Sequence, residues 1–291
     1  MHGLLFAVAM SSAVVLRMLW HWSLNDRSSD SRDRKSWNQR WIGAMFSFVL
    51  PPLLLLTSAM ALLWMGPQGM GISPLEGLGT YGMSAGFLIG AIAIGFELVF
   101  SARASIRQLR RYPMQVWDEL GLRARLLPLD VPFIAQVGLW NPEIVVSRGL
   151  LTQLDDEHLK AVIAHEQAHA KYHDTFWFFC FGGLRRLTGW LPKTDALWQE
   201  LLMLRELRAD RVAIQQTDPL LLAEALVLLV RSPMEHQDWA ATLNPEMPRD
   251  RFEERISAIL DAEPLMPIPG WQMSAIVLAG LLPLLMVPFH H

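Results

Sequence analysis

Residues 161–169 read Ala-Val-Ile-Ala-His-Glu-Gln-Ala-His, a stretch that combines two imidazoles with a carboxylate. On an α-helix, His165 and His169 are four residues apart, so they project from one face, one turn above the other. Two imidazoles at this spacing can bind one zinc ion, and Glu166 beside them can act as a base on water. We therefore predict a zinc site with His165 and His169 as ligands and Glu166 as the catalytic base.

This spacing is the His-Glu-x-x-His pattern of zinc metallopeptidases. By ordinary amino-acid usage it should occur by chance in roughly one chain in a hundred, so its context matters. Small and apolar residues surround the three polar groups, as expected of a helix that packs against a sheet. A solvated helix with two accidental histidines would carry more polar neighbours. The surrounding residues are Ala161, Val162, Ile163, Ala164 and Ala168.

Catalytic zinc usually has three protein ligands and one open position, so two histidines leave the site incomplete. His173 is a poor third ligand if the helix continues through it. It would then lie about 12 Å from His165 along the axis, whereas zinc–nitrogen bonds are only about 2.1 Å long. Residues 170–173 contain no Gly or Pro, so no break in the helix is predicted there.

A better candidate lies in residues 195–216, which have a helical pattern between two prolines. Glu206 and Asp210 are four residues apart and share one face of this expected helix. We predict that Glu206 is the third zinc ligand and that Asp210 hydrogen-bonds the free nitrogen of a ligand histidine. The alternative is an exposed helix in which both acids pair with the neighbouring arginines. Asp174 either orients a ligand histidine, pairs with an arginine or merely ends the first helix.

The composition indicates a membrane protein, since 52% of the 291 residues are hydrophobic and the mean hydropathy is +0.24. We expect three transmembrane helices within residues 1–102, each near the length that a bilayer requires. A zinc peptidase domain follows at 103–270 and a fourth transmembrane helix at 271–291. The three N-terminal helices are expected at about 3–22, 42–65 and 81–102.

The distribution of Lys and Arg predicts the orientation. Five basic residues lie between the first two expected spans, and four follow the third, whereas 66–80 carries none. We therefore expect a multi-pass protein, in a bacterial cell membrane, whose zinc domain faces the cytoplasm. The single cysteine, Cys180, excludes an intramolecular disulfide and suits that side of the membrane. The apolar stretch 176–191 is expected as a helix on the membrane surface or against the bundle.

Residues 123–147 carry β-forming residues punctuated by prolines, which predicts a small antiparallel sheet. An edge strand beside a metal can hold an extended substrate by β-strand addition. We assign that role to Glu143, Ile144, Val145 and Val146, with an ordinary core strand as the alternative. Asp155 or Asp156 is expected to cap the zinc helix. The segment 250–262 predicts an amphipathic helix, on which we favour a surface role for Arg255 over a place in the active site.

These residues together resemble the membrane metallopeptidase domain of the BlaR/MecR type, a gluzincin. The resemblance rests on His165-Glu166-Gln167-Ala168-His169, on Glu206 with Asp210, and on Asn141-Pro142-Glu143-Ile144-Val145-Val146 before them. It implies an α+β membrane protein with about four transmembrane helices and a cytoplasmic gluzincin-like zinc peptidase domain, built from helices and a small antiparallel sheet. It also implies one Zn²⁺ ion bound by His165, His169 and Glu206, with Glu166 as the base.

The resemblance implies a protein substrate as partner, such as a small DNA-binding repressor whose cleavage relieves repression. The family's antibiotic sensors carry an extracellular penicillin-binding domain after the last helix, and this chain ends just past that helix, so we do not expect β-lactam sensing. The first alternative is an HtpX-like quality-control protease, although HtpX-type proteases usually place two spans between the zinc motif and the third ligand. The second is a non-catalytic membrane scaffold. The sequence contains no basic patch with interleaved aromatic residues, so nucleic-acid binding is not predicted. The oligomeric state is open.

Overall fold

The computed structural model describes residues 8, 10–18, 37–66, 74–231, 251–261 and 270–289. They fall into two compact units. The first unit comprises Met1–Phe96, Gly183–Leu201 and Met266–His291, and the second comprises Glu97–Gly182 and Leu202–Leu265. The zinc motif and the downstream acids all belong to the second unit.

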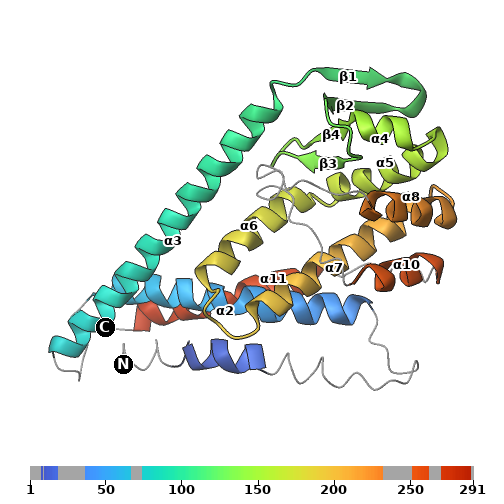
Figure 1. Ribbon diagram of the computed structural model, residues 1–291. Coiled ribbons are helices and arrows are strands. Elements are labelled where there is room, and N and C mark those ends of the chain that lie inside the picture. The colour runs from blue at the N-terminus through green and yellow to red at the C-terminus, as the bar shows by residue number, and fades with distance from the viewer. Residues whose placement is uncertain are drawn as a thin grey trace. The chain divides into compact units, whose positions relative to one another are not determined.

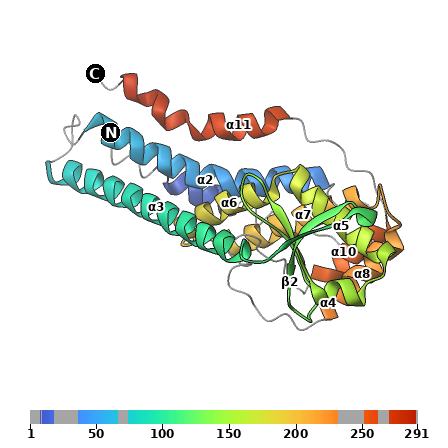
Figure 2. The same cartoon turned by 90° about the horizontal axis from the view of Figure 1, so that it is seen from above.

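The first unit is helical and apolar. Its central helix, α2 (Trp37–Met65), packs against α11 (Gly270–Gly280), which runs alongside it (Figure 2). The hydroxyl of Thr57 donates a 2.7 Å hydrogen bond to the carbonyl of Gly280, and a Cβ at Gly280 would collide with Leu53. A glycine therefore allows the two helices to approach closely.

The segment Gly183–Leu201 belongs to the first unit although it lies inside the expected 103–270 domain. Leu191 packs with Leu55 of α2, and Trp198 lies 5.9 Å from Phe48, ring centre to ring centre. Long-range packing of this kind cannot be read from local sequence patterns.

Two of the four expected spans form helices that are long and apolar enough to cross a membrane, at Trp37–Met65 and Gly77–Leu109. The second lies in α3 (Pro74–Leu109), which is much longer than the expected 81–102. The C-terminal span is not one α-helix, because α11 ends at Gly280 and a 3-10 segment, η4 (Leu282–Phe289), follows. Pro283 disfavours a continuous helix here. The expected first span lies partly outside the described residues, of which 10–18 are helical.

The second unit contains a four-stranded sheet with the order β1-β2-β4-β3 (Figure 1). Its strands are β1 (Met114–Trp117), β2 (Leu122–Leu127), β3 (Ile134–Val137) and β4 (Glu143–Ser147). One face, with Leu122, Ala124 and Val146, packs on the helix that carries the zinc motif. The opposite face, with Val145 and Leu127, packs on the end of α3.

Two predictions about this sheet are wrong. The sheet is mixed rather than antiparallel, since β2 pairs with β4 in parallel while β1–β2 and β3–β4 are antiparallel. Strand β4 is also not an edge strand, because it lies between β2 and β3. The β3–β4 hairpin docks onto β2 through its second strand, so β3 becomes the outermost strand on that side.

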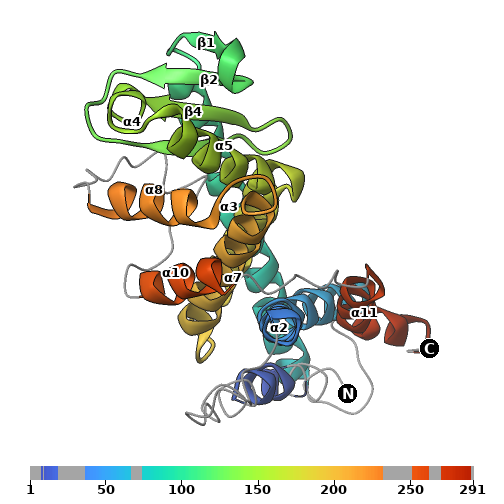
Figure 3. The same ribbon diagram turned by 90° about the vertical axis from the view of Figure 1, so that its right-hand side faces the viewer.

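Helices α4 (Arg148–Gln153), α5 (Asp156–Lys171), α7 (Thr194–Ala213), α8 (Pro219–Arg231) and α10 (Phe252–Leu260) build the rest of the site's framework. A buried cluster joins Ala161 and Ala164 of α5 to Ala213, Leu226 and Ile259. Figure 3 shows α8 and α10 beside the second-unit part of α7. Small side chains at these contacts allow the helices to pack closely.

Helix α6 (Asp174–Leu187) follows α5 almost directly, which corrects a further prediction. Asp174 begins this helix and does not end α5, which stops at Lys171. The break occurs without Gly or Pro because His173 adopts the left-handed conformation, with φ 53°.

Candidate metal centre

Helix α5 is fixed at both its start and its inner face. Asp155 caps it by accepting hydrogen bonds from the backbone N–H groups of Glu157 and His158, as predicted for Asp155 or Asp156. Val162 and Ile163 anchor the helix in the core beneath the sheet. His165 and His169 therefore project from a helix whose position and rotation are both set by packing.

The two histidines bring one ring nitrogen each to a common point. Their Nε2 atoms lie 3.1 Å apart, and both side chains are buried. Two nitrogens bound tetrahedrally to one zinc ion at about 2.05 Å would lie about 3.3 Å apart. The pair therefore fits the first two positions of a zinc site.

Each histidine is oriented through its other ring nitrogen by a buried carboxylate. The Nδ1 atom of His165 lies 2.9 Å from Asp210 Oδ1, and that of His169 lies 2.8 Å from Asp174 Oδ2. These contacts fix the rings so that the Nε2 atoms face each other. The structure thus brings both predicted orienting acids to the site, and Asp174 also forms an ion pair with Arg208.

Glu206, on α7, places its carboxylate beside the Nε2 atoms of the two histidines. Its carboxylate oxygens lie 3.3 Å from His165 Nε2 and 3.6 Å from His169 Nε2, separations close to those expected of ligands around one ion. Arg205 donates to Glu206 Oε1 at 2.8 and 2.9 Å. The alternative of an exposed helix is wrong, since Glu206 and Asp210 are both buried.

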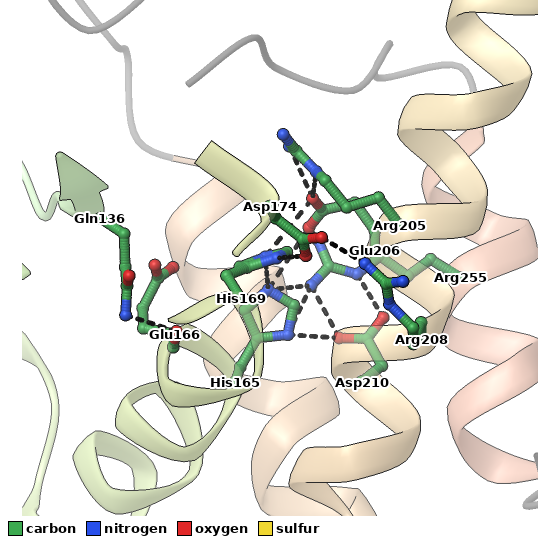
Figure 4. A network of polar contacts seen from close by, with 10 residues as sticks. All are labelled: Gln136, His165, Glu166, His169, Asp174, Arg205, Glu206, Arg208, Asp210 and Arg255. Atoms are coloured by element: carbon green, nitrogen blue, oxygen red, sulfur yellow. Dashed lines mark hydrogen bonds and ion pairs between the residues drawn. The ribbon is translucent and has the colours of Figure 1, made fainter. Parts of the chain in front are cut away.

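Glu166 lies beside the histidines but is left without a hydrogen bond at one oxygen. Its Oε2 atom is buried and has no partner among the described residues. The ligand atoms of His165, Glu166 and His169 lie within 4.8 Å of one another. The side chain of Gln136, on β3, donates a 2.7 Å hydrogen bond to the backbone carbonyl of Glu166 (Figure 4). A buried acceptor with an open oxygen is what a water-activating base requires.

Arg255 of α10 is also part of this network, so the preference for a surface role was wrong. Its Nε and one terminal nitrogen contact both oxygens of Asp210, at 2.5 and 2.7 Å. The other terminal nitrogen lies 3.2 Å from Glu206 Oε2. Long-range packing of α10 against α7 and α8, which no local pattern shows, brings Arg255 inside.

Neighbouring charges set the protonation of the acids. Burial alone would raise the pKa values of Glu206 and Asp210. Positive neighbours outweigh burial and hold both pKa values below their ordinary range: chiefly Arg205 and Arg255 at Glu206, and Arg255 and His165 at Asp210. Burial dominates at Glu166 and raises the pKa of that carboxyl. Burial and Arg255 lower the pKa of His165, yet Asp210 and Glu206 overcome them and raise it to about 9.

Sequence reasoning missed three contributors to this site: Gln136, Arg205 and Arg208. A lone glutamine in a short strand gives no signal of its role. The two arginines carried a signal that pointed the other way, because arginines beside acids on a helix usually form solvated ion pairs. The predicted substrate residues Glu143 to Val146 lie on the internal strand β4.

A helix with two converging histidines, joined by an acid from a second helix, defines a metallopeptidase type of site. Residues 135–243 match the model of Peptidase family M48, so this part of the chain is similar to metallopeptidases of that family. The match includes α5 and α7, which hold every predicted ligand.

The chain is also similar to a protein named "Protease HtpX homolog" from Aquifex aeolicus (strain VF5). The two are 31% identical over a region that covers 37% of this chain and 50% of the relative. The chain thus spans about half the length of this curated relative. Both comparisons thus show similarity to M48 peptidases over part of the chain, and neither shows the narrower BlaR/MecR type.

Proposed function

We propose that this protein is a membrane-bound zinc metalloendopeptidase that hydrolyses peptide bonds in cytoplasmic or membrane-proximal proteins. The observation that carries the proposal is the convergence of His165, His169 and Glu206 beside the partnerless oxygen of Glu166. Imidazole and carboxylate donors at these separations suit zinc.

In this proposal His165, His169 and Glu206 hold one Zn²⁺ ion, and Asp210 and Asp174 keep the two rings in ligating orientation. When bound, zinc would lower the pKa of a water molecule and polarise the scissile carbonyl. Glu166 accepts the proton of the attacking water and passes it to the leaving amine. The raised pKa of Glu166 suits a group that must both take and return a proton.

We further propose that an extended substrate binds alongside β3. This strand is outermost in the sheet and, within the described residues, pairs only with β4. Gln136 of β3 bonds to the backbone of Glu166, so a substrate strand added there would lie next to the base. The proposed substrate-binding strand is therefore β3, and the internal strand β4 does not have this role.

Two narrower functions are consistent with an M48 membrane peptidase. Regulated cleavage of a repressor follows from the BlaR/MecR resemblance and is supported by the connection between His169 and Glu206. Those intervening residues, all described, hold the 14-residue α6 and neither candidate membrane helix. An HtpX-like role is supported by the similarity to the Aquifex protein. In either case we propose that the site faces the cytoplasm, because the basic loops predict that orientation.

A survey of protein N-termini in cells tests the proposal, with wild type compared against Glu166→Gln. The substitution removes the base but keeps the ligands, so we expect zinc to stay bound and cleavage products to disappear. New termini in one repressor would support regulated cleavage, and scattered termini in many membrane proteins would support the HtpX-like role.

Glu157→Gln is the matched control, since this exposed glutamate lies in the first turn of the same helix. It should leave the pattern of termini unchanged. If the wild type and Glu166→Gln gave the same termini under every growth condition, a catalytic role would be contradicted and a scaffold favoured.

A further inference from the structure

Among the described residues, Arg255 is the one strongly buried arginine that reaches the site from beyond the M48 match. The match ends at residue 243, whereas Arg255 lies on α10 (Phe252–Leu260). Its side chain is only 9% exposed, and its helix is held in the core by Ile259, which is fully buried. The packing of α10 thus commits a charged group to the interior, which is costly unless that group is paired.

The guanidinium connects three groups of the proposed zinc site at once. It grips both oxygens of Asp210, contacts Glu206 Oε2 at 3.2 Å, and has a terminal nitrogen 3.2 Å from His165 Nε2. Asp210 in turn orients His165, and Glu206 is the proposed third ligand. A planar fork that binds two carboxylates fixes their mutual position, which a single-point ammonium cannot do.

We propose that Arg255 is a positioning residue of the metal centre, and that α10 therefore completes a site whose ligands all lie within residues 135–243. Arg255 does not bind the ion. It holds Glu206 and Asp210 so that the carboxylate and the His165 ring meet the ion in ligating geometry. The inference rests on the proposed zinc site.

A role of Arg255 through its charge and a role through positioning predict opposite changes in zinc affinity when the side chain is removed. A nearby positive charge repels Zn²⁺, so if Arg255 acted only through its charge, its removal would tighten zinc binding. If Arg255 acts by positioning, its removal weakens binding, because the two carboxylates lose their common anchor. Loss of groups that orient metal ligands typically reduces affinity 10–100-fold.

The first experiment measures Zn²⁺ affinity of the full chain in detergent, by competition with a chromophoric chelator. We expect Arg255→Ala to bind zinc about 10–100-fold more weakly. Arg255→Lys keeps the charge but not the fork, so it should show most of the same loss. Equal or tighter zinc binding in Arg255→Ala, or full rescue by lysine, would overturn the inference.

The matched control is Arg251→Ala. Arg251 precedes the same helix and pairs with Glu254 one turn away, at 2.6 and 3.0 Å, so its loss should leave zinc affinity unchanged. Visible absorption of the Co²⁺-loaded chain gives a second readout, since it reports the geometry of the ligands. The spectrum should change in Arg255→Lys and stay constant in Arg251→Ala.

A measurement on the unaltered chain covers the case in which Arg255→Ala does not fold. If Arg255 helps zinc to bind, zinc must equally help α10 to stay docked. Amide hydrogen exchange of residues 252–260 should therefore quicken when zinc is removed by a chelator, while β1 is unaffected. Unchanged exchange in α10 would overturn the inference alone. A chain that binds no zinc would overturn the proposed function with it.

Discussion

The two halves of the proposed metal centre are built in different ways. One half comes from α5, where His165, Glu166 and His169 lie within five consecutive positions of one helix. The other half comes from α7 and α10, where Glu206, Asp210 and Arg255 converge over 50 positions of sequence. In the first half the helix itself creates the spacing, and in the second half packing between helices creates it.

The first half holds the groups proposed to react, and the second half holds groups that fix their positions. The α5 half offers a local arrangement of proposed ligand, base and ligand. The second half supplies a carboxylate to the same point and surrounds it with guanidinium groups, which hold its pKa low and its position fixed. Substitutions in the second half should therefore affect metal binding through long-range partners.

The largest expected effect breaks the second half outright. Glu206→Ala should weaken zinc binding more than about 100-fold, because it removes a direct ligand, and loss of orienting groups alone costs 10–100-fold. Zinc content after dialysis against a weak chelator measures it. Glu224→Ala, at an exposed glutamate of α8, is the matched control. Full zinc occupancy in Glu206→Ala would show that Glu206 is not a ligand.

A second pair of substitutions compares the two orienting acids. Asp174→Asn and Asp210→Asn should each weaken zinc binding about 10–100-fold, since each frees one ligand ring. With zinc kept saturating in both variants, only Asp210→Asn should also quicken amide exchange in α10, because Asp210 alone of the two binds Arg255. Equal exchange in both variants would show that the two halves are not built differently.

The contact between the halves can be tested by overpacking. Ala168 of α5 is buried against Ala209 and Val212 of α7, so Ala168→Leu should force the helices apart. Its expected cost is about 1–3 kcal/mol in the free energy of unfolding, accompanied by weaker zinc binding. Denaturant unfolding measures the first effect. Gln167→Leu, at an exposed position of the same helix, should change neither the free energy of unfolding nor zinc binding. If it changed either, the effect of Ala168→Leu could not be assigned to the contact between α5 and α7.

The smallest expected effect lies at the far end of α5. His158 is close to Asp155 and Glu224, at 2.7 and 3.1 Å, and the hydrogen bond to Asp155 contributes most to raising its pKa above the ordinary value. A raised pKa in the folded chain means that this stabilisation is complete below about pH 6.5. It is lost as the pH rises through the folded-state pKa.

His158→Gln should accordingly cost only a few tenths of a kcal/mol, because the acids are exposed to solvent. The difference from wild type should vanish at high pH, as measured by thermal unfolding across pH 5–9. A difference that grew with pH would contradict the sign of the shift. Zinc affinity should be unaffected, since His158 and its partner Asp155 lie at the opposite end of α5 from His169.

The sequence was most informative where the interaction is local. The helix expected at 195–216 is α7 (Thr194–Ala213), and Asp155 caps α5, because caps and helical periodicity depend on neighbours within four residues. The exception is local too: α5 ends without Gly or Pro, because His173 takes the left-handed conformation that a breaker residue would supply.

Sequence reasoning failed where pairing is between distant segments. The order of the strands placed β4 inside the sheet, and its Val-Val pair is equally suited to an edge or a centre. Arg255 was missed for a related reason. An arginine on an amphipathic helix predicts a solvated face, and only the packing of Ile259 shows that this face is turned inward.

The most direct test of the account is a zinc-edge anomalous difference map from crystals of the chain. We predict one peak, about 2.1 Å from His165 Nε2, His169 Nε2 and a carboxylate oxygen of Glu206. Arg255 should stay on Asp210 and out of contact with the ion. A peak ligated by Glu166 in place of Glu206, or no peak between the two halves in zinc-loaded protein, would contradict it.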